Sequence, residues 1–284
     1  MQQTVLVTGA TGNVGREIVR ALTARNVAVR AGMRKPAQAE QAPGVEAVWL
    51  DYERPESFAP AMAGAKTLAL LMPALNPPNE VEQATALVDA ARRAGVEYIV
   101  KLSVIGADLN DASAHRQVEK YIEATSIPYA HLRPNFYMQN YTMYNTDDIK
   151  YRNRIYLPAG DGKQSLIDSR DLGDAFAIVL TEPGHTGRAY TLTGSESLDH
   201  DEIAAILSQA LGRTITYARP SPEEYQQTMR AAGMPEARIN TMLGLYGAVA
   251  QGWVAAISPD LPTLLGRAPI TFAQYARDYA DQWR

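Results

Sequence analysis

The sequence predicts an α/β protein with a doubly wound parallel sheet and a small, mainly helical C-terminal region. Three observations lead there: short apolar runs alternate with longer helical patterns, a glycine-rich turn follows the first run, and the alternation loosens after about residue 135. Short apolar runs between helices are typical of strands that a parallel sheet buries on both faces. The first half of the chain should therefore hold most of the sheet.

Six strands are expected in this half, because each run is short and apolar. They lie at 4–7, 27–31, 47–50, 66–72, 98–103 and 129–132. Helices are expected over 14–24 and 81–93, where apolar side chains recur on one face, and Gly95 follows the second helix as its C-terminal stop. Strands and helices thus alternate as βαβ units.

The region after residue 135 is predicted to complete the sheet and to add helices. Short strands are expected at 165–168 and 189–193, with a helix over 171–181 between them. Capping patterns that start at Asp199, Ser221 and Thr271 indicate three further helices. We assign 1–150 to a sheet domain, and 151–284 to the remaining strands and a helical cap that is interleaved with that domain rather than independent.

Composition excludes several classes of function. The 284 residues carry 27 Lys and Arg against 31 Asp and Glu, a net charge of −4, whereas a general nucleic-acid or anionic-membrane binder needs a basic excess. The absence of cysteine excludes disulfides, thiol catalysis and Cys-type metal sites, and the four histidines have no metal-ligand spacing. With no long apolar run and no signal-peptide pattern, we expect a cytoplasmic protein without a metal site, a membrane span or a nucleic-acid partner.

The segment TGATGNVG, residues 8–15, is the motif in the sequence that most clearly indicates a binding site. It follows the first strand and opens the first helix, where one glycine allows the tight turn, one lets the backbone approach a pyrophosphate, and one permits close packing of helix on strand. Exposed N–H groups and the helix dipole then face the phosphates. We assign Thr8, Gly9, Thr11, Gly12, Asn13 and Val14 to a dinucleotide site and residues 1–150 to its binding domain; the alternative is an ordinary structural turn.

The residues that select between NAD and NADP are expected at the end of the second strand. An NAD enzyme usually places an acid there for the ribose 2′-hydroxyl, whereas this chain has Arg34 and Lys35 and no acid before Glu40. Two cations would attract a 2′-phosphate and leave a 2′-hydroxyl without an acceptor. The sequence therefore predicts NADPH, with a solvated basic loop as the alternative.

Several segments together resemble the NmrA-like family, an atypical branch of the short-chain dehydrogenase/reductases. They are residues 8–15, 101–106, 115–119, 132–140, 167–171, 192–194, 265–267 and 283–284. The resemblance covers essentially the whole chain and implies an extended Rossmann fold with a small C-terminal substrate region. The branch includes NADPH-dependent quinone, triphenylmethane-dye and iminium reductases, and regulators that bind the cofactor without evident turnover.

The resemblance also implies further cofactor contacts. By family position Asp51 would approach the adenine, and Met72 and Pro73 the middle of the cofactor. The nicotinamide end would lie against a segment just after the sixth strand. That segment comprises Pro134, Asn135 and Phe136.

The sequence departs from the wider superfamily at its Tyr-x-x-x-Lys pair. The tyrosine position resembles His115 and the lysine position Glu119, while Lys120 lies about 100° further round the helix. Ser103 stands where the superfamily has its catalytic serine. His115 is therefore either a replacement proton donor, with an unperturbed pKa near working pH, or a helix residue whose position has lost its role.

Aromatic and methionine side chains follow the sixth strand, at the edge where open α/β sheets bind ligands. Tyr137 and Met138 are typical of a pocket for a flat apolar substrate, although ordinary core packing explains them equally well. Trp253 either lines such a pocket or packs within the cap.

Three functions remain open on the sequence alone. The first is an NADPH-dependent reductase of a small electron-poor or cationic aromatic compound, such as a quinone, dye or iminium. The second is a redox-sensing regulator that binds NADP without turnover. The third is an epimerase-like enzyme of the nucleotide-sugar type, disfavoured because the Tyr–Lys pair is missing. The partner expected for the reductase is a small aromatic substrate, whereas the regulator would report through a partner protein. The chain is expected to be a monomer or homodimer.

Overall fold

The computed structural model describes residues 4–39, 42–73 and 79–284. The chain forms two compact units. The sheet unit comprises Met1–Pro134, Ser169–Leu192 and Thr263–Gly266, and the helical unit comprises Asn135–Asp168, Thr193–Pro262 and Arg267–Arg284. The chain first leaves the sheet unit after Pro134, whereas the sequence placed the domain boundary at residue 150.

Within the described residues, a seven-stranded parallel sheet runs in the order β3-β2-β1-β4-β5-β6-β8. The strands are β1 (Thr4–Val7), β2 (Ala28–Met33), β3 (Val45–Trp49), β4 (Thr67–Leu70), β5 (Tyr98–Leu102), β6 (Tyr129–Pro134) and β8 (Arg188–Leu192). This is the doubly wound Rossmann order with one strand added. Because β1 pairs with β2 on one side and β4 on the other, the connections reverse direction beside β1, which is where such sheets bind ligands.

The predicted α/β fold class is confirmed. The six predicted strands of the first half all form, with ends that differ by up to two residues, and so does the strand expected at 189–193. The strand expected at 165–168 is wrong. Its backbone bonds to several segments in turn rather than to one partner strand: Ser165 N–H donates to Val254 O and Ile167 N–H to Phe136 O.

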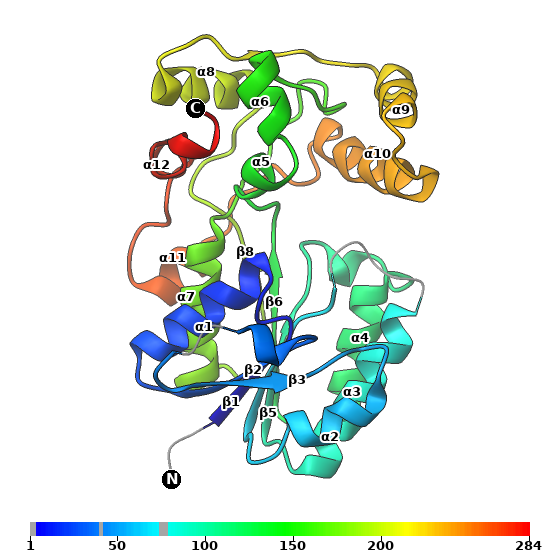
Figure 1. Cartoon of the computed structure of the whole chain (residues 1–284), viewed down its shortest axis with the longest axis vertical. Coiled ribbons are helices and arrows are strands. Elements are labelled where there is room, and N and C mark those ends of the chain that lie inside the picture. Colours follow the sequence, from blue (N-terminus) through cyan, green and yellow to red (C-terminus); the bar gives the residue numbers. More distant parts are fainter. Residues whose placement is uncertain (1–3, 40–41, 74–78) are drawn as a thin grey trace. The chain divides into compact units, whose positions relative to one another are not determined.

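Helices cover both faces of the sheet. In Figure 1, α1 (Asn13–Ala24) and α7 (Ser169–Thr181) lie side by side on one face, and α2 (Phe58–Ala61), α3 (Glu80–Ala94) and α4 (Ala114–Glu123) cover the other. Helices α1 and α7 approach closely because Gly173 has no side chain. A Cβ there would lie 2.6 Å from the Glu17 carbonyl carbon.

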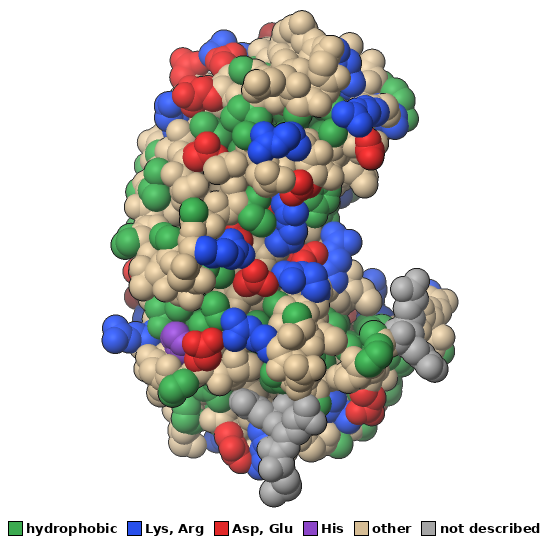
Figure 2. Space-filling view, turned by 90° about the vertical axis from the view of Figure 1, so that its left-hand side faces the viewer, with side chains coloured by type: hydrophobic (Ala, Val, Ile, Leu, Met, Phe, Trp, Pro, Cys, Tyr) green, Lys and Arg blue, Asp and Glu red, His purple; other side chains and the backbone are tan. Residues whose placement is uncertain are grey.

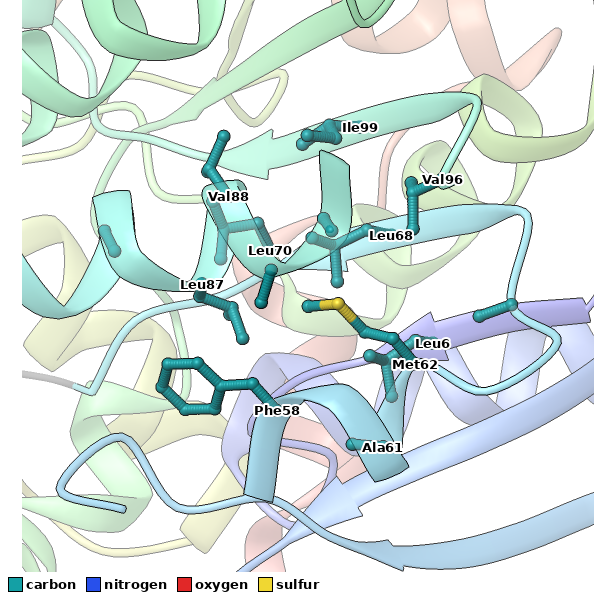
Figure 3. Close-up of a cluster of buried hydrophobic side chains, with 14 of the residues drawn as sticks. Leu6, Phe58, Ala61, Met62, Leu68, Leu70, Leu87, Val88, Val96 and Ile99 are labelled. Atoms are coloured by element: carbon teal, nitrogen blue, oxygen red, sulfur yellow. The ribbon is translucent and has the colours of Figure 1, made fainter. Parts of the chain in front are cut away.

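The main apolar core lies between the sheet and the second helical face. Figure 3 shows Leu6, Leu68 and Leu70 of the strands meeting Phe58 of α2 and Leu87 of α3, all of them buried. Burying one such side chain contributes roughly 1.5–3 kcal/mol. This core fixes the positions of β1, β4 and β5, whose carboxyl ends carry the candidate site.

The helical unit contains a short parallel pair, β7 (Arg154–Ile155) with β9 (Thr216–Tyr217), and several helices. These are α5 (Asn140–Met143), α6 (Thr146–Arg152), α8 (His200–Leu211), α9 (Pro222–Ala231), α10 (Glu236–Ala250), α12 (Phe272–Asp278) and, shared with the sheet unit, α11 (Asp260–Leu265). The three predicted caps form: Asp199 and Ser221 make capping boxes, and Thr271 accepts from Gln274 N–H. Short 3₁₀ turns lie at Pro36–Gln38, Pro55–Ser57, Ala107–Leu109 and Ala280–Gln282.

The surface mixes both signs of charge. On the face that Figure 2 shows, Lys and Arg side chains alternate with Asp and Glu, and hydrophobic side chains lie between them. Among the described helices, none combines the length and the apolar character that crossing a bilayer requires.

Candidate active site

The predicted cofactor residues of the sheet unit follow the carboxyl ends of five parallel strands. Thr8 to Val14 follow β1, Arg34 and Lys35 follow β2, Asp51 follows β3, Met72 and Pro73 follow β4, and Pro134 ends β6. Carboxyl ends of parallel strands share one edge of a sheet. The fold therefore brings these residues to a common edge from positions up to 126 residues apart, counted from Thr8 to Pro134.

The glycine-rich turn has the geometry that its motif predicts. Gly9 has φ +58°, a left-handed conformation that suits glycine, and its carbonyl accepts from Gly12 N–H at 2.9 Å. A Cβ on Gly15 would lie 2.1 Å from the Gly9 carbonyl oxygen. Helix α1 can therefore pack against this turn only with glycine at position 15.

The N-terminus of α1 is free to receive an anion. Its N-cap residue, Gly12, provides no side-chain cap, and the first turn of the helix contains no acidic residue. The Asn13 amide nitrogen is buried and donates to no acceptor within the described ranges, while its oxygen accepts from Arg16. Unpaired donors at the positive end of a helix dipole fit a phosphate group.

Thr8 positions the turn rather than offering a free donor. Its buried hydroxyl donates to Leu71 O at 2.8 Å and accepts from Leu71 N–H at 2.7 Å. The side chain thus ties the end of β1 to the end of β4. Met72 and Pro73 leave β4 directly beyond this tie.

Arg34 and Lys35 are both exposed at the end of β2, and neither forms a salt bridge with another residue in the described ranges. Glu40 lies outside those ranges. Asp51 is half-buried after β3, and its carboxylate accepts from Glu53 N–H at 3.0 Å. The two cations are therefore available to an anionic group.

A buried ion pair includes Glu119, the residue expected at the position of the superfamily lysine. Glu119 of α4 is fully buried and accepts from Arg133 of β6 through both carboxylate oxygens, and from Arg116 at 3.0 Å. Burial alone would raise the pKa of Glu119, but the hydrogen bonds from Arg133, with the nearby Ser103 hydroxyl, hold it at about 2. Ser103 thus faces a permanent carboxylate.

A fully buried lysine lies beside this pair. Lys101 of β5 donates to Leu102 O at 3.0 Å, and its Nζ lies 3.3 Å from Nδ1 of His115, the second residue of α4. Burial lowers the pKa of Lys101 to about 8, opposed by the charges of Glu119 and Glu80. Burial and the neighbouring Lys101 charge lower the pKa of His115 to about 4, so the imidazole is neutral at neutral pH.

Comparison with known proteins identifies the family. The sequence profile described as the NmrA-like family matches residues 1–258. The chain belongs to the NmrA-like family. It is 32% identical to an NAD(P)H azoreductase of Xenophilus azovorans over 97% of this chain and 98% of that protein, and 28% identical to quinone oxidoreductase 2 of Escherichia coli over 95% and 96%.

The solved structures of this NmrA-like fold agree with the sequence comparison. The crystal structure of the Citrobacter sp. triphenylmethane reductase complexed with NADP(H) matches 98% of this chain and 99% of its own, with a TM-score of 0.88 and 30% identity. The E. coli quinone oxidoreductase QOR2 complexed with NADPH matches 97% of this chain and 99% of its own, with a TM-score of 0.87 and 26% identity.

In this NmrA-like chain Lys120 does not replace the missing superfamily lysine. Its side chain is 47% exposed and pairs with Asp111 at 2.7 Å. Ligand atoms of Glu119, Glu123 and His131 lie within 4.8 Å of one another, a spacing that could hold a cation. Both carboxylates, however, already accept from Arg116. We read this group as an ion-pair network.

The remaining predicted residues belong to the helical unit. The Asn135 amide is fully engaged: its nitrogen donates to Ser165 Oγ and Val254 O, each at 2.8 Å, and its oxygen accepts from Phe136 N–H. Within its own unit, then, Asn135 fixes the turn after β6.

The three predicted substrate residues differ in exposure. Met138 is buried and Tyr137 half-buried, whereas Trp253, in the turn after α10, is 70% exposed. Trp253 therefore does not pack within the helical unit, which was one of its two predicted roles.

The sequence reasoning missed two buried charged residues. Lys101 interrupts an otherwise apolar strand, and this lone lysine was the signal that could have found it. Glu80 gave no such signal, because an acid in the first turn of a helix is ordinary. Its carboxylate is buried, neither oxygen has a hydrogen-bond partner among the described residues, and burial raises its pKa.

Proposed function

We propose that this chain transfers hydride from NADPH to a small electron-poor or cationic aromatic compound of the quinone, dye or iminium type. The observation that carries the proposal is the uncapped N-terminus of α1, with its orphaned Asn13 amide, at the reversal point of the sheet. The family relatives named as NAD(P)H azoreductase and quinone oxidoreductase support the reaction class. The chain is accordingly an NAD(P)H-dependent oxidoreductase.

The residues present fit the cofactor. The uncapped N-terminus of α1 and the unpaired Asn13 side-chain amide suit the pyrophosphate, and Arg34 and Lys35 suit the 2′-phosphate of NADPH. When bound, the cofactor supplies a hydride from its nicotinamide ring. We propose that Asp51, Met72, Pro73, Pro134, Asn135 and Phe136 contact the rest of it.

The substrate class follows from the proton chemistry. Reducing a simple ketone produces an alkoxide, and a positioned acid contributes typically ~10²–10⁴-fold to such a step. The superfamily tyrosine is absent here, so acceptors that need little or no proton donation are favoured. We propose a flat aromatic acceptor that contacts Tyr137, Met138 and Trp253.

Of the two candidate catalytic residues, His115 is the better placed. Its imidazole is half-buried at the start of α4, whereas Ser103 is buried and faces Glu119. We propose that His115 contacts the reduced substrate and that Ser103 is a positioning residue.

A panel of acceptors tests this function. Purified protein is mixed with NADPH and, in turn, with a triarylmethyl dye, a quinone, an azo dye and an aliphatic ketone, and the fall in NADPH absorbance is followed with NADH as control. We expect turnover with the dyes or quinone and little with the ketone. Cofactor binding without turnover of any acceptor would instead support an NADP-sensing regulator.

A further inference from the structure

The hydrogen bond between Lys101 and His115 has a defined donor and a defined acceptor. A lysine ammonium can only donate a hydrogen bond, so the His115 Nδ1 atom, 3.3 Å away, must accept it while Lys101 is charged. A neutral imidazole that accepts at Nδ1 carries its proton on Nε2. The buried lysine therefore selects one tautomer of the half-buried histidine.

We propose that Lys101 is a positioning and proton-supplying residue, which holds His115 in the Nε2–H tautomer so that this N–H protonates the reduced acceptor. The inference rests on the proposed reductase function and concerns those of its acceptors that must gain a proton after hydride transfer. It assigns the pair to acceptors that become basic anions on reduction, above all azo compounds and quinones. Cationic dyes, which become neutral on accepting hydride, do not need it.

The proton balance closes. Hydride addition leaves an anion on the acceptor nitrogen or oxygen, and that atom takes the proton from His115 Nε2. As this N–H bond breaks, Nδ1 takes a proton from Lys101, which leaves a neutral amine and a neutral imidazole protonated at Nδ1. After product release, a solvent proton enters at Nε2 and the Nδ1 proton returns to Lys101. Lys101 itself is fully buried, so its proton must pass through a neighbour.

The surroundings of Lys101 keep it charged near neutral pH yet able to lose its proton. Glu80 of α3 and Glu119 of α4 favour the ammonium, while burial and Arg133 make it costly. The adjacent His131 of β6 is neutral near pH 7, because burial lowers its pKa to about 4. Glu119 is neutralised by Arg133, whereas the Glu80 carboxylate has no hydrogen-bond partner among the described residues. Glu119 nevertheless stabilises the charged lysine more than Glu80 does.

Nitrogen NMR on histidine-labelled protein tests the tautomer without any turnover. The His115 signals, assigned by their loss in His115→Gln, should show the Nε2–H tautomer at pH 7. They should shift as Lys101 titrates near pH 8, and this shift should vanish in Lys101→Met. A wild-type Nδ1–H tautomer would overturn the proposal. So would His115 signals whose pH-dependent shift near pH 8 is the same in Lys101→Met as in the wild type. The wild-type spectrum needs no variant to fold.

Turnover rates with two dyes then show whether Lys101 relays a proton or only supports the fold. Lys101→Met should slow reduction of an azo dye at least about tenfold in kcat, and reduction of crystal violet, a triarylmethyl cation, less than about threefold. The matched control is Lys120→Met, which removes an exposed lysine of α4, the helix that carries His115, and should change neither rate. Equal losses with both dyes would mean that Lys101 serves only the fold, and would sink the proposal.

Different results would contradict the reductase function and the proton relay. If no acceptor is reduced by the wild-type protein, the reductase function is wrong, although the NMR result can still stand. If the wild-type protein reduces both dyes and Lys101→Met reduces both at the wild-type rate, the function holds and the relay is wrong.

Discussion

The Arg133 guanidinium holds the Glu119 carboxylate with two parallel hydrogen bonds, Nε to Oε1 at 3.0 Å and Nη2 to Oε2 at 2.8 Å. This pair fastens α4 to β6. A carboxylate so engaged has no proton to give at neutral pH. We therefore propose that the proton chemistry of the site falls to the neighbouring Lys101 and His115.

Removing one member of the Glu119–Arg133 pair should destabilise the fold strongly. Glu119→Gln keeps the shape but leaves a largely buried guanidinium without its main counter-charge, which we expect to cost about 3 kcal/mol in the free energy of unfolding. Urea denaturation measures it. The control is Lys66→Ala in the exposed Lys66–Glu97 pair, where the expected cost is below about 1 kcal/mol. Similar losses in both variants would show that the Glu119–Arg133 pair is not special.

The fold followed from the sequence because its signals are local. Each strand of the first half is a short apolar run. The capping boxes that begin at Asp199 and Ser221 each span only four consecutive residues and so indicate a helix start locally. The segment 165–168 misled because a strand also needs a partner of matching length. Its backbone groups are taken up by separate segments, which only the tertiary structure reveals.

Acidification should destabilise the protein before most carboxylates titrate. Burial lowers the pKa of His200 to about 4, so between pH 6.5 and 4 the unfolded chain binds a proton that the folded chain does not. The contribution of His200 to stability is then full above pH 6.5 and falls as the pH drops, by up to about 1.4 kcal/mol per pH unit. His115 and His131, whose pKa values burial also lowers to about 4, add to this fall. His200→Phe should show a shallower fall across this window and a parallel curve above pH 7. Identical slopes for both proteins would refute a neutral buried His200.

The close approach of α1 to the glycine turn makes Gly15 irreplaceable. Gly15→Ala puts a methyl group 2.1 Å from the Gly9 carbonyl oxygen, and we expect a loss of roughly 3 kcal/mol in stability together with weaker NADPH binding. Gly244→Ala, in the exposed middle of α10 with open space around it, should instead stabilise by up to about 1 kcal/mol. Thermal unfolding and cofactor titration of both variants decide the point.

The preference for NADPH should depend on Arg34. Arg34→Ala removes an exposed cation at the end of β2, and we expect the ratio of NADH to NADPH dissociation constants to fall by roughly ten- to a hundredfold. Arg25→Ala, at the opposite end of α1 and paired with Glu182, should leave that ratio unchanged. An unchanged ratio in Arg34→Ala would mean that other groups select the cofactor.

The candidate site was only partly readable from the sequence. The glycine motif was readable because a dinucleotide imposes its spacing on consecutive residues. Lys101, Glu80 and His115 come from β5, α3 and α4, and their relationship exists only once the helices pack on the sheet. A buried charge also looks like a surface charge until its burial is known.

The most direct test of the account follows the hydride itself. The protein is incubated with crystal violet and NADPH that carries deuterium at both C4 positions of the nicotinamide, and the colourless product is analysed by mass spectrometry. A carbon–deuterium bond formed at the central carbon does not exchange with water. We predict one deuterium per molecule of reduced dye, formed at a rate that depends on the protein. Reduced dye without deuterium, or no reduction of dye, quinone or azo compound by a protein that binds NADPH, would contradict the central claim.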